Sequence, residues 1–249
     1  MEFTIKLAGI PVGVRSLHES TRDLCRDYLT DEEPYFSVTS GEDEIAAERE
    51  RSAKADEAEG RTVQPYSDEY LETLAVYRKI AEKMTERDIL LFHGSVIAVD
   101  GKAYLFTAPS GTGKSTHTRL WRKVLPPLGH DVYMVNDDKP LLKFTDEAVF
   151  ACGTPWDGKH HLSRNCMVPL KGVCRIHQAP QNEIRTMKAG DAWPVLFRQS
   201  YRPEDPAHAA ATLRMLDRLL TGVPLFELHC NMDPEAALIS WRAMGEKGA

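Results

Sequence analysis

The segment AYLFTAPSGTGKSTHTRLW, residues 103–121, constrains the fold of this chain more than any other stretch. It opens with an apolar run typical of a short buried strand, and Pro109 and four small residues then interrupt it. Residues 114–123 have the composition of a helix. A strand, a glycine-containing loop and a helix in this order direct successive backbone N–H groups toward an anion at a helix N-terminus. The segment therefore predicts a phosphate-binding loop of the Walker A type.

The predicted loop has one unusual position. The common pattern opens with glycine, where this chain has Ala108, and a positive φ there would cost about 1 kcal/mol. Lys114 would reach the β- and γ-phosphates of a nucleoside triphosphate, and the Ser115 hydroxyl would complete the shell of a Mg²⁺ ion. We expect ATP, or another nucleoside triphosphate, to bind with Mg²⁺ at Ser110, Gly111, Thr112, Gly113, Lys114, Ser115 and Thr116.

Length, charge and hydrophobic pattern argue against a nucleic-acid-binding protein and against a membrane protein. A chain of 249 residues can bury a substantial core as one domain or two small ones. Its net charge of −6 argues against a nucleic-acid partner, which would need a basic face. No apolar run approaches the roughly 20 residues of a membrane span, and the alternating N-terminal segment is unlike a signal peptide. We expect a cytoplasmic protein without a membrane or nucleic-acid partner, whose five scattered cysteines are reduced thiols.

The chain is expected to divide after residue 88. Residues 1–88 would form an N-terminal α/β region, in which an alternating strand over 3–7 is followed by a helix over 17–29 and a strand over 35–38. Residues 41–60 are charged and rich in alanine, so they are interpreted as a solvated helix or a mobile connector. A surface that recruits a peptide is the alternative.

Residues 89–249 would form a kinase core around the phosphate-binding loop. Residues 89–99 and 103–106 are expected to be two strands joined by Asp100-Gly101, the strongest short hairpin signal in the chain. A second hairpin is expected over 140–151. Hairpins on both sides of the loop are incompatible with a purely parallel sheet, so we predict an α/β (α+β) fold with a mixed sheet surrounded by helices. The other expected elements are strands over 131–135, 168–177 and 224–229, and helices over 67–87, 189–199 and 206–220 and after Asp233.

A pair of aspartates follows the predicted strand in YMVNDDKPLL. Asp137 and Asp138 stand where a P-loop protein places the acid that holds its metal ion. The second carboxylate can face an acceptor and take its hydroxyl proton, and which residue has which role is left open. A turn without a chemical role is the alternative.

The loop and the acidic pair together resemble the phosphoenolpyruvate carboxykinase and HPr kinase/phosphorylase superfamily. The segment FHGSVIAVDGKAYLFTAPSGTGKSTHTRL is most similar to HPr kinase. The resemblance implies catalytic roles for Lys114, Asp137 and Asp138, metal binding by Ser115 and the two aspartates, and a histidine, His93, that tunes the protonation of the acidic pair. A core histidine bonded to the backbone is the alternative for His93. The downstream signature of the phosphorylase reaction is absent, so only the kinase reaction is carried over.

The loop ACGTPWDGKHHLSRN, residues 151–165, carries side chains suited to an acceptor. Lys159 and Arg164 could hold an anion, and Trp156 could form a wall of the pocket. An ordinary surface loop is the alternative. Two arginines farther along could stabilise the charge of the transferred group or form helix-terminal salt bridges. The acceptor-binding candidates are Trp156, Asp157, Lys159, Arg164, Arg198 and Arg202.

These observations predict an ATP- and Mg²⁺-dependent kinase. The acceptor would be a hydroxyl group, either on a serine of a small protein or peptide or on a small molecule, and the oligomeric state is left open. A carboxykinase-like lyase would need further metal ligands, an arginine cluster and a longer chain. A non-catalytic ATP-binding regulatory protein is the other alternative, and ATP consumption that depends on one acceptor would separate it from a kinase.

Overall fold

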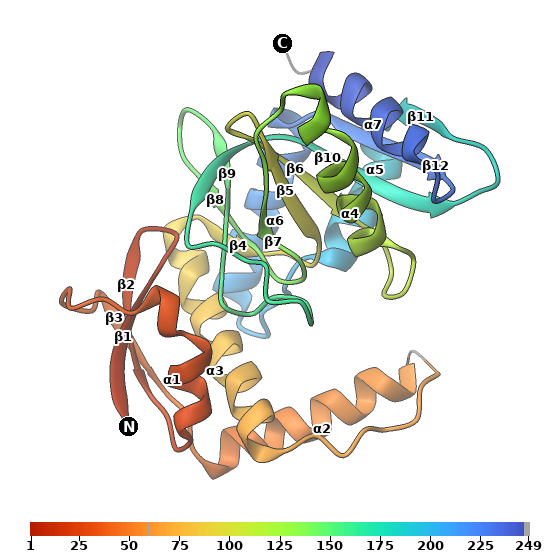
Figure 1. Ribbon diagram of the computed structural model, residues 1–249. Coiled ribbons are helices and arrows are strands. Elements are labelled where there is room, and N and C mark those ends of the chain that lie inside the picture. The colour runs from red at the N-terminus through yellow and green to blue at the C-terminus, as the bar shows by residue number, and fades with distance from the viewer. Residues whose placement is uncertain (59, 247–249) are drawn as a thin grey trace. The chain divides into compact units, whose positions relative to one another are not determined.

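The computed structural model describes residues 1–58 and 60–246, which form two compact units (Figure 1). The N-terminal unit comprises Met1–Lys83 and the C-terminal unit Met84–Ala249. The division therefore falls a few residues before the boundary expected after residue 88. Helix α3 (Asp68–Met84) ends at this division, and each unit has its own sheet.

The sheet of the N-terminal unit has three strands in the order β1-β2-β3. β1 (Glu2–Leu7) pairs antiparallel with β2 (Ile10–Arg15), and β2 pairs parallel with β3 (Phe36–Thr39). The expected strand, helix and strand are present, but the prediction missed β2 between the first strand and the helix. Pro11 and Gly13 lie inside β2, and both residue types weaken a strand signal in a sequence.

Charged side chains join the helices of the N-terminal unit. The segment interpreted as a solvated helix or a connector is helix α2 (Glu42–Ala58). Its Glu48 side chain is buried and accepts two hydrogen bonds of 2.8 Å from the Arg78 guanidinium on α3. The buried Glu72 of α3 accepts the backbone N–H of Leu17, just before the short helix α1 (Glu19–Leu24) and the 3₁₀ turn η1 (Arg26–Tyr28). Helix α2 has few aliphatic residues, so the hydrogen-bonded Glu48 carboxylate, in place of an apolar side chain, links it to α3.

The C-terminal unit contains a nine-stranded mixed sheet in the part of the chain that the structure describes. The strand order is β4-β8-β9-β10-β6-β5-β7, and β12 pairs with both β10 and β11. Strands β6, β10 and β12 are parallel to one another and the other pairs are antiparallel, so the predicted mixed sheet is confirmed. The strands are β4 (Ile89–Leu91), β5 (Ser95–Val99), β6 (Lys102–Thr107), β7 (Val132–Asn136), β8 (Leu141–Phe144), β9 (Val149–Cys152), β10 (Met167–Gln178), β11 (Glu183–Thr186) and β12 (Leu225–Cys230).

The single strand expected over 89–99 was wrong, because it is interrupted at His93-Gly94 and its two parts pair with different strands. β4 pairs with β8, whereas β5 lies between β6 and β7. His93 N–H donates to the Gln199 carbonyl and Gly94 N–H to the Asp138 carbonyl. The expected hairpin between β5 and β6 is confirmed, and both turn residues, Asp100 and Gly101, have positive φ, as a tight I′ turn requires.

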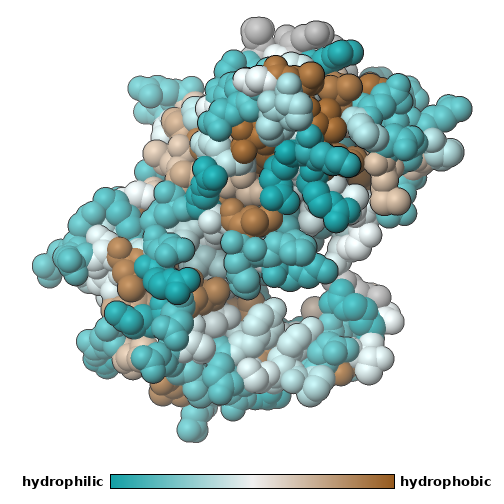
Figure 2. Space-filling view, in the orientation of Figure 1, coloured by the Kyte–Doolittle hydropathy of each residue, from teal (hydrophilic) through white to brown (hydrophobic). Residues whose placement is uncertain are grey.

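Helices cover both faces of this sheet (Figure 1). Apolar side chains of α5 and α6 pack into one core cluster, and those of α4 and α7 into another. Hydrophilic residues cover most of the face seen in Figure 2, with apolar areas between them. Among the described residues, none of the helices has both the length and the apolar character that a membrane crossing demands. The helices are α4 (Lys114–Val124), α5 (Ala189–Gln199), α6 (Pro206–Gly222) and α7 (Pro234–Glu246), with short 3₁₀ turns η2 (Thr85–Arg87) and η3 (Pro126–Leu128).

Candidate functional site

The predicted phosphate-binding segment forms a loop, residues 108–113, between the end of β6 and the first turn of α4. We call it the glycine loop. Gly111 has a φ of 77° and Gly113 a φ of 110°, a region that favours glycine. Ala108 is not among the residues with positive φ and is buried, so alanine at the start of this loop carries no positive-φ strain. The loop lies at the carboxyl end of a parallel strand, where open α/β sheets bind ligands.

Lys114 folds back over the glycine loop. Its ammonium group donates to the carbonyl of Ala108 at 2.9 Å and to that of Pro109 at 3.4 Å, and the residue is only 8% exposed. Ser110 and Gly111, at the tip of the loop, are exposed. The positive charge is therefore held at the base of a loop whose tip is open to solvent.

Asp137 is linked to the first turns of α4 by two hydroxyl groups. Its carboxylate is buried and accepts a hydrogen bond of 2.6 Å from Ser95 on β5. The Ser95 hydroxyl lies 3.1 Å from that of Thr118, which follows Ser115 by one helical turn. These contacts place Asp137 beside the helix that carries the predicted metal-binding hydroxyl.

Asp138 has a different environment. His93 Nε2 lies 3.4 Å from one carboxylate oxygen, and the Lys139 ammonium forms an ion pair with the other. Burial raises the pKa of Asp138, but the hydrogen bond from His93 and the charge of Lys139 outweigh it, so the pKa lies well below its usual value. His93 Nδ1 lies 2.7 Å from the side-chain oxygen of Gln199, the last residue of α5. The structure thus brings His93 to one member of the acidic pair.

Asn136 organises this region, and the sequence reasoning assigned it no role. The residue is fully buried, and its side-chain oxygen accepts the backbone N–H groups of Asp138 and Lys139 at 2.9 and 2.7 Å. Its amide nitrogen donates to the carbonyls of Thr154 and Trp156. An asparagine that bonds the N–H two residues later is an Asx turn, so the Asn-Asp-Asp order was the available signal.

The loop expected to bind the acceptor also reaches Asp137. A Cβ built on Gly158 would lie 3.0 Å from the Asp137 carboxylate, so a glycine lets the backbone cover that group. Asp157 accepts the N–H of Ser163 and lies 3.1 Å from His161 Nδ1. The Asp157 carboxylate therefore stabilises the loop to which it belongs, through contacts with two later residues of that loop.

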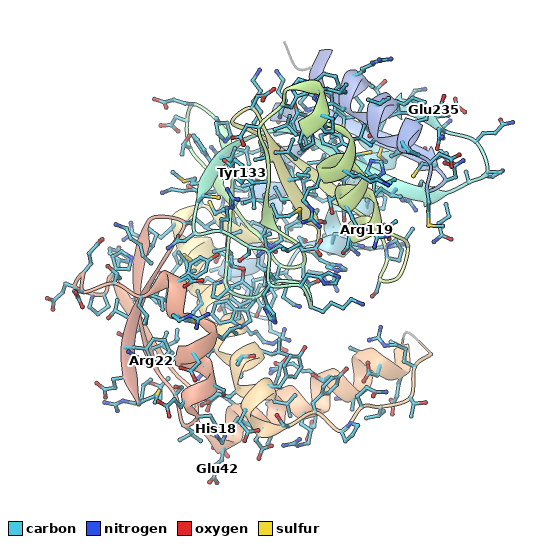
Figure 3. The ribbon with its side chains drawn as sticks, viewed as in Figure 1. His18, Arg22, Glu42, Arg119, Tyr133 and Glu235 are labelled. Atoms are coloured by element: carbon cyan, nitrogen blue, oxygen red, sulfur yellow. The ribbon has the colours of Figure 1, made fainter. Side chains whose placement is uncertain are left out.

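The other candidates on this loop are dispersed. Trp156 is buried, whereas Lys159 is exposed. The Arg164 guanidinium lies 4.6 Å from the ring centroid of Tyr133, which Figure 3 labels. Their placement does not create one convergent anion site.

The two arginines of the α5 region differ. Arg202 donates to the carbonyls of Phe197 and Arg198, so it caps the C-terminus of the helix, and the structure shows carbonyl partners in place of the helix-terminal salt bridge considered for it. Arg198 is exposed and lines a cavity together with Ala108 and Pro109.

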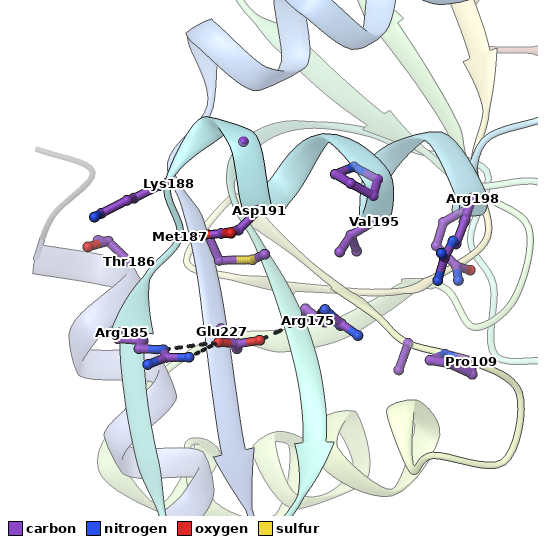
Figure 4. Close-up of a pocket in the computed structure, with 14 residues that line it drawn as sticks. Pro109, Arg175, Arg185, Thr186, Met187, Lys188, Asp191, Val195, Arg198 and Glu227 are labelled. Carbon is purple, nitrogen blue, oxygen red and sulfur yellow. Dashed lines mark hydrogen bonds and ion pairs between the residues drawn. The ribbon is translucent and has the colours of Figure 1, made fainter.

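Several cavities meet the glycine loop in the described part of the chain, and one of about 420 Å³ at residues 109–112 is lined by both Arg175 and Ile176. Two larger cavities differ in their lining. The first, which we call the charged cavity, has a volume of about 640 Å³ and is lined by Ala108, Pro109, residues of α5 and residues of β10, β11 and β12 (Figure 4). The second, which we call the apolar cavity, has a volume of about 530 Å³ and meets the loop at residues 111–113. Its other lining residues include Thr116, Leu120, Ile176, Cys230 and Met232.

One further cluster of metal-ligand types lies near the charged cavity. The donor atoms of His177, Glu227 and His229 lie within 4.8 Å of one another. However, Arg185 already binds Glu227 through hydrogen bonds of 2.6 and 3.0 Å, and the two imidazole rings stack with an interplanar angle of 9°. Parallel rings do not direct their lone pairs at one ion, so we interpret the cluster as an ion-pair network. Hydroxyl and carboxylate oxygens, the ligands that Mg²⁺ prefers, occur instead at Ser115 and Asp137.

Comparison with known proteins gives a distant likeness. No family model matches the chain, and no curated protein matches it. Among solved structures, the HPr(Ser) kinase/phosphatase from Coxiella burnetii is similar, with a TM-score of 0.33 and 12% identity. The match covers 63% of this chain and 95% of that chain. The resemblance is at the level of the fold at most.

Proposed function

We propose that this protein is an ATP- and Mg²⁺-dependent kinase, similar to HPr kinase, that transfers the γ-phosphoryl group to a hydroxyl acceptor. The observation that carries the proposal is one arrangement: the glycine loop with Lys114 folded over it, and two aspartates at the end of β7 in different environments. Phosphoryl transfer depends on positioning and charge neutralisation, which these groups can supply.

The nucleotide would lie along the glycine loop and α4. Its phosphates would meet the backbone N–H groups at the loop tip and the N-terminus of α4, and the Lys114 ammonium would leave the loop carbonyls for the phosphate oxygens. Its base would occupy the apolar cavity against Leu120, Ile176 and Met232. Mg²⁺ would be held by Ser115 and Asp137.

Asp138 would face the acceptor. Its low pKa keeps the carboxylate ionised, so it can accept a hydrogen bond from the hydroxyl group and orient it. It would take the proton as that oxygen bonds to phosphorus and becomes strongly acidic. As the acceptor oxygen bonds to the γ-phosphorus, the bond to the bridging oxygen breaks and ADP leaves with the electron pair. His93 and Gln199 would position the carboxylate.

A non-catalytic ATP-binding regulatory protein is the second candidate. The observation that favours it is the ion pair between Lys139 and Asp138, which occupies the carboxylate assigned to the acceptor. The two functions differ in turnover, because a regulatory protein would bind ATP without steady consumption.

Calorimetric titration of the full chain with ATP, with and without Mg²⁺, tests the shared part of both functions. A screen of hydroxyl acceptors with γ-labelled ATP then separates them. We expect Mg²⁺-dependent binding and transfer of label to one class of acceptor. Absence of nucleotide binding would contradict both functions, whereas binding without transfer to any acceptor would favour the regulatory protein.

A further inference from the structure

The charged cavity concentrates basic side chains in a protein whose net charge is −6. It lies over the face of the sheet that carries Arg175 and Glu227, with α5 on its other side (Figure 4). Among the described residues that line it, four are basic and two are acidic. The basic residues are Arg175, Arg185, Lys188 and Arg198, and the acidic residues are Asp191 and Glu227.

Only part of this positive charge is neutralised within the protein. Arg185 forms two hydrogen bonds with Glu227, but Arg175 approaches the same carboxylate only to 3.9 Å. Within the described residues, Lys188 and Arg198 form no ion pair with a carboxylate. Burial raises the pKa of Glu227, but its hydrogen bond from Arg185 and the nearby positive charges lower it below its usual value, so this group stays ionised and paired. Cations of the cavity therefore remain available for a ligand.

The charged cavity meets the proposed reaction centre at two points. At one point it is lined by Ala108 and Pro109, whose carbonyls accept the Lys114 ammonium. At the other it is lined by Gln199, whose side chain contacts His93, the partner of Asp138. The wall of the cavity therefore includes direct contacts of both Lys114 and His93.

The proposed nucleotide site leaves this cavity unfilled. The apolar cavity meets the glycine loop at residues 111–113, whereas the charged cavity meets it at Ala108 and Pro109. A phosphoryl group at the loop could thus pass from a nucleotide on one side to an acceptor on the other.

We propose that the charged cavity binds the acceptor, and that the acceptor is a small hydroxylated anion bearing a phosphate or carboxylate group. This inference rests on the proposed kinase function. Guanidinium groups match both anions geometrically, and a volume of about 640 Å³ is in the range of small-molecule sites. Asp191, at the cavity wall, offers an acceptor for further hydroxyl groups of the ligand. Asp138 is not among the lining residues, so the hydroxyl group would extend past Gln199 toward His93 and Asp138. Its oxygen attacks the γ-phosphorus, its proton passes to Asp138, and ADP leaves with the electron pair of the broken bond.

The test measures binding of two anionic probes and one neutral probe to the full chain without nucleotide. Glycerol 3-phosphate represents the phosphate class, glycerate the carboxylate class and glycerol the neutral control. Titrations would extend to about 10 mM, because a fragment of the true ligand is expected to bind in the millimolar range. We expect one anion to bind and glycerol not to bind. The anion that binds identifies the class.

Arg175→Gln and Arg198→Gln should each weaken binding of that anion at least about 10-fold, because each removes a charged hydrogen-bond donor. Arg214→Gln, at an exposed arginine of α6, is the matched control and should leave binding unchanged. Equal affinity in all four proteins, binding of glycerol, or binding of an acidic peptide in place of both small anions would overturn the proposal.

Lys114→Ala separates this proposal from the kinase proposal. Lys114→Ala should bind ATP more weakly but bind the anionic probe as wild type does. Arg198→Gln should bind ATP as wild type does but bind the anionic probe more weakly. If wild-type protein binds ATP but neither anion, the acceptor proposal fails and the nucleotide site stands. If it binds an anion in an Arg198-dependent way but no nucleotide, the kinase proposal fails and the anion site stands.

Discussion

The charged cavity and the apolar cavity share the glycine loop but differ in chemistry. Arg175 lines the charged cavity, whereas its neighbour Ile176 lines the apolar cavity. Both residues belong to β10, and successive side chains of a strand point to opposite faces of a sheet. One strand therefore contributes an arginine to one cavity and an isoleucine to the other, and both residues also line a smaller cavity at residues 109–112. The comparison suggests that the loop separates two ligands, and the following experiments test that division.

The largest effect is expected at Lys114, whose ammonium group contacts the glycine loop that both cavities meet. Lys114→Ala removes the ammonium that would bind the phosphates, so phosphoryl transfer should be lost and ATP should bind much more weakly. Calorimetry and a transfer assay measure the two effects. Lys123→Ala, at an exposed lysine of the same helix, should behave as wild type. Unchanged ATP affinity in Lys114→Ala would show that the nucleotide does not bind at this loop.

The two aspartates should respond differently to loss of charge. Asp137→Asn and Asp138→Asn should each lower turnover about 100-fold or more, the scale of a positioned acid–base group. Asp137→Asn should also raise the Mg²⁺ concentration needed for half-maximal activity, whereas Asp138→Asn should leave it unchanged. If Asp138→Asn instead of Asp137→Asn raised the Mg²⁺ concentration needed, the two proposed roles would be exchanged. If both variants kept wild-type turnover, the two aspartates would have a structural role and no catalytic one.

A smaller effect is expected at His93. Its hydrogen bond is one cause of the low pKa of Asp138, so His93→Ala should raise that pKa. The acidic limb of the pH–rate profile should then move to higher pH, because more of the carboxylate is protonated at a given pH. Because the imidazole also positions the carboxylate, which stays ionised near neutral pH, we expect turnover to fall about 10-fold there through loss of positioning, with ATP affinity retained. His208→Ala, whose histidine contacts Glu86, is the control, and an unshifted profile in His93→Ala would reject this role.

The smallest effect is expected in the apolar cavity. Met232 is 74% exposed and would pack against the nucleotide base, so Met232→Ala should weaken ATP binding by only about 2- to 5-fold. Anionic probes in the charged cavity should be unaffected. Leu128→Ala, at an exposed apolar residue outside both cavities, is the control. If Met232→Ala lost more affinity for the anionic probe than for ATP, the assignment of the two ligands to separate cavities would be contradicted.

Local patterns predicted several elements well and failed where pairing decided the outcome. Asp100-Gly101 indicated its hairpin because both residues tolerate positive φ. Strand β11 was not expected, since its residues Glu183–Thr186 are largely exposed and gain their strand conformation by pairing with β12. The break at Gly94 was also missed, because the apolar pattern continues through it.

The candidate site shows the same limit. Ser110–Thr116 and the two aspartates could be selected from the sequence, because each set is contiguous and has characteristic residue types. Ser95 precedes its partner Asp137 by 42 residues, and Gln199 follows His93 by 106. A serine and a glutamine carry no local signal of such contacts.

The sequence by itself determined the glycine loop, the helix that follows it and the acidic pair, because backbone preference and residue chemistry act within a few neighbouring residues. Only the tertiary structure decided that His93 contacts Asp138 and that Arg175, Arg185 and Arg198 meet at one cavity. These arginines come from β10, β11 and α5, which parallel and antiparallel pairing and helix packing bring together across long stretches of chain. Such contacts depend on the free energy of the whole sheet, which no local pattern encodes.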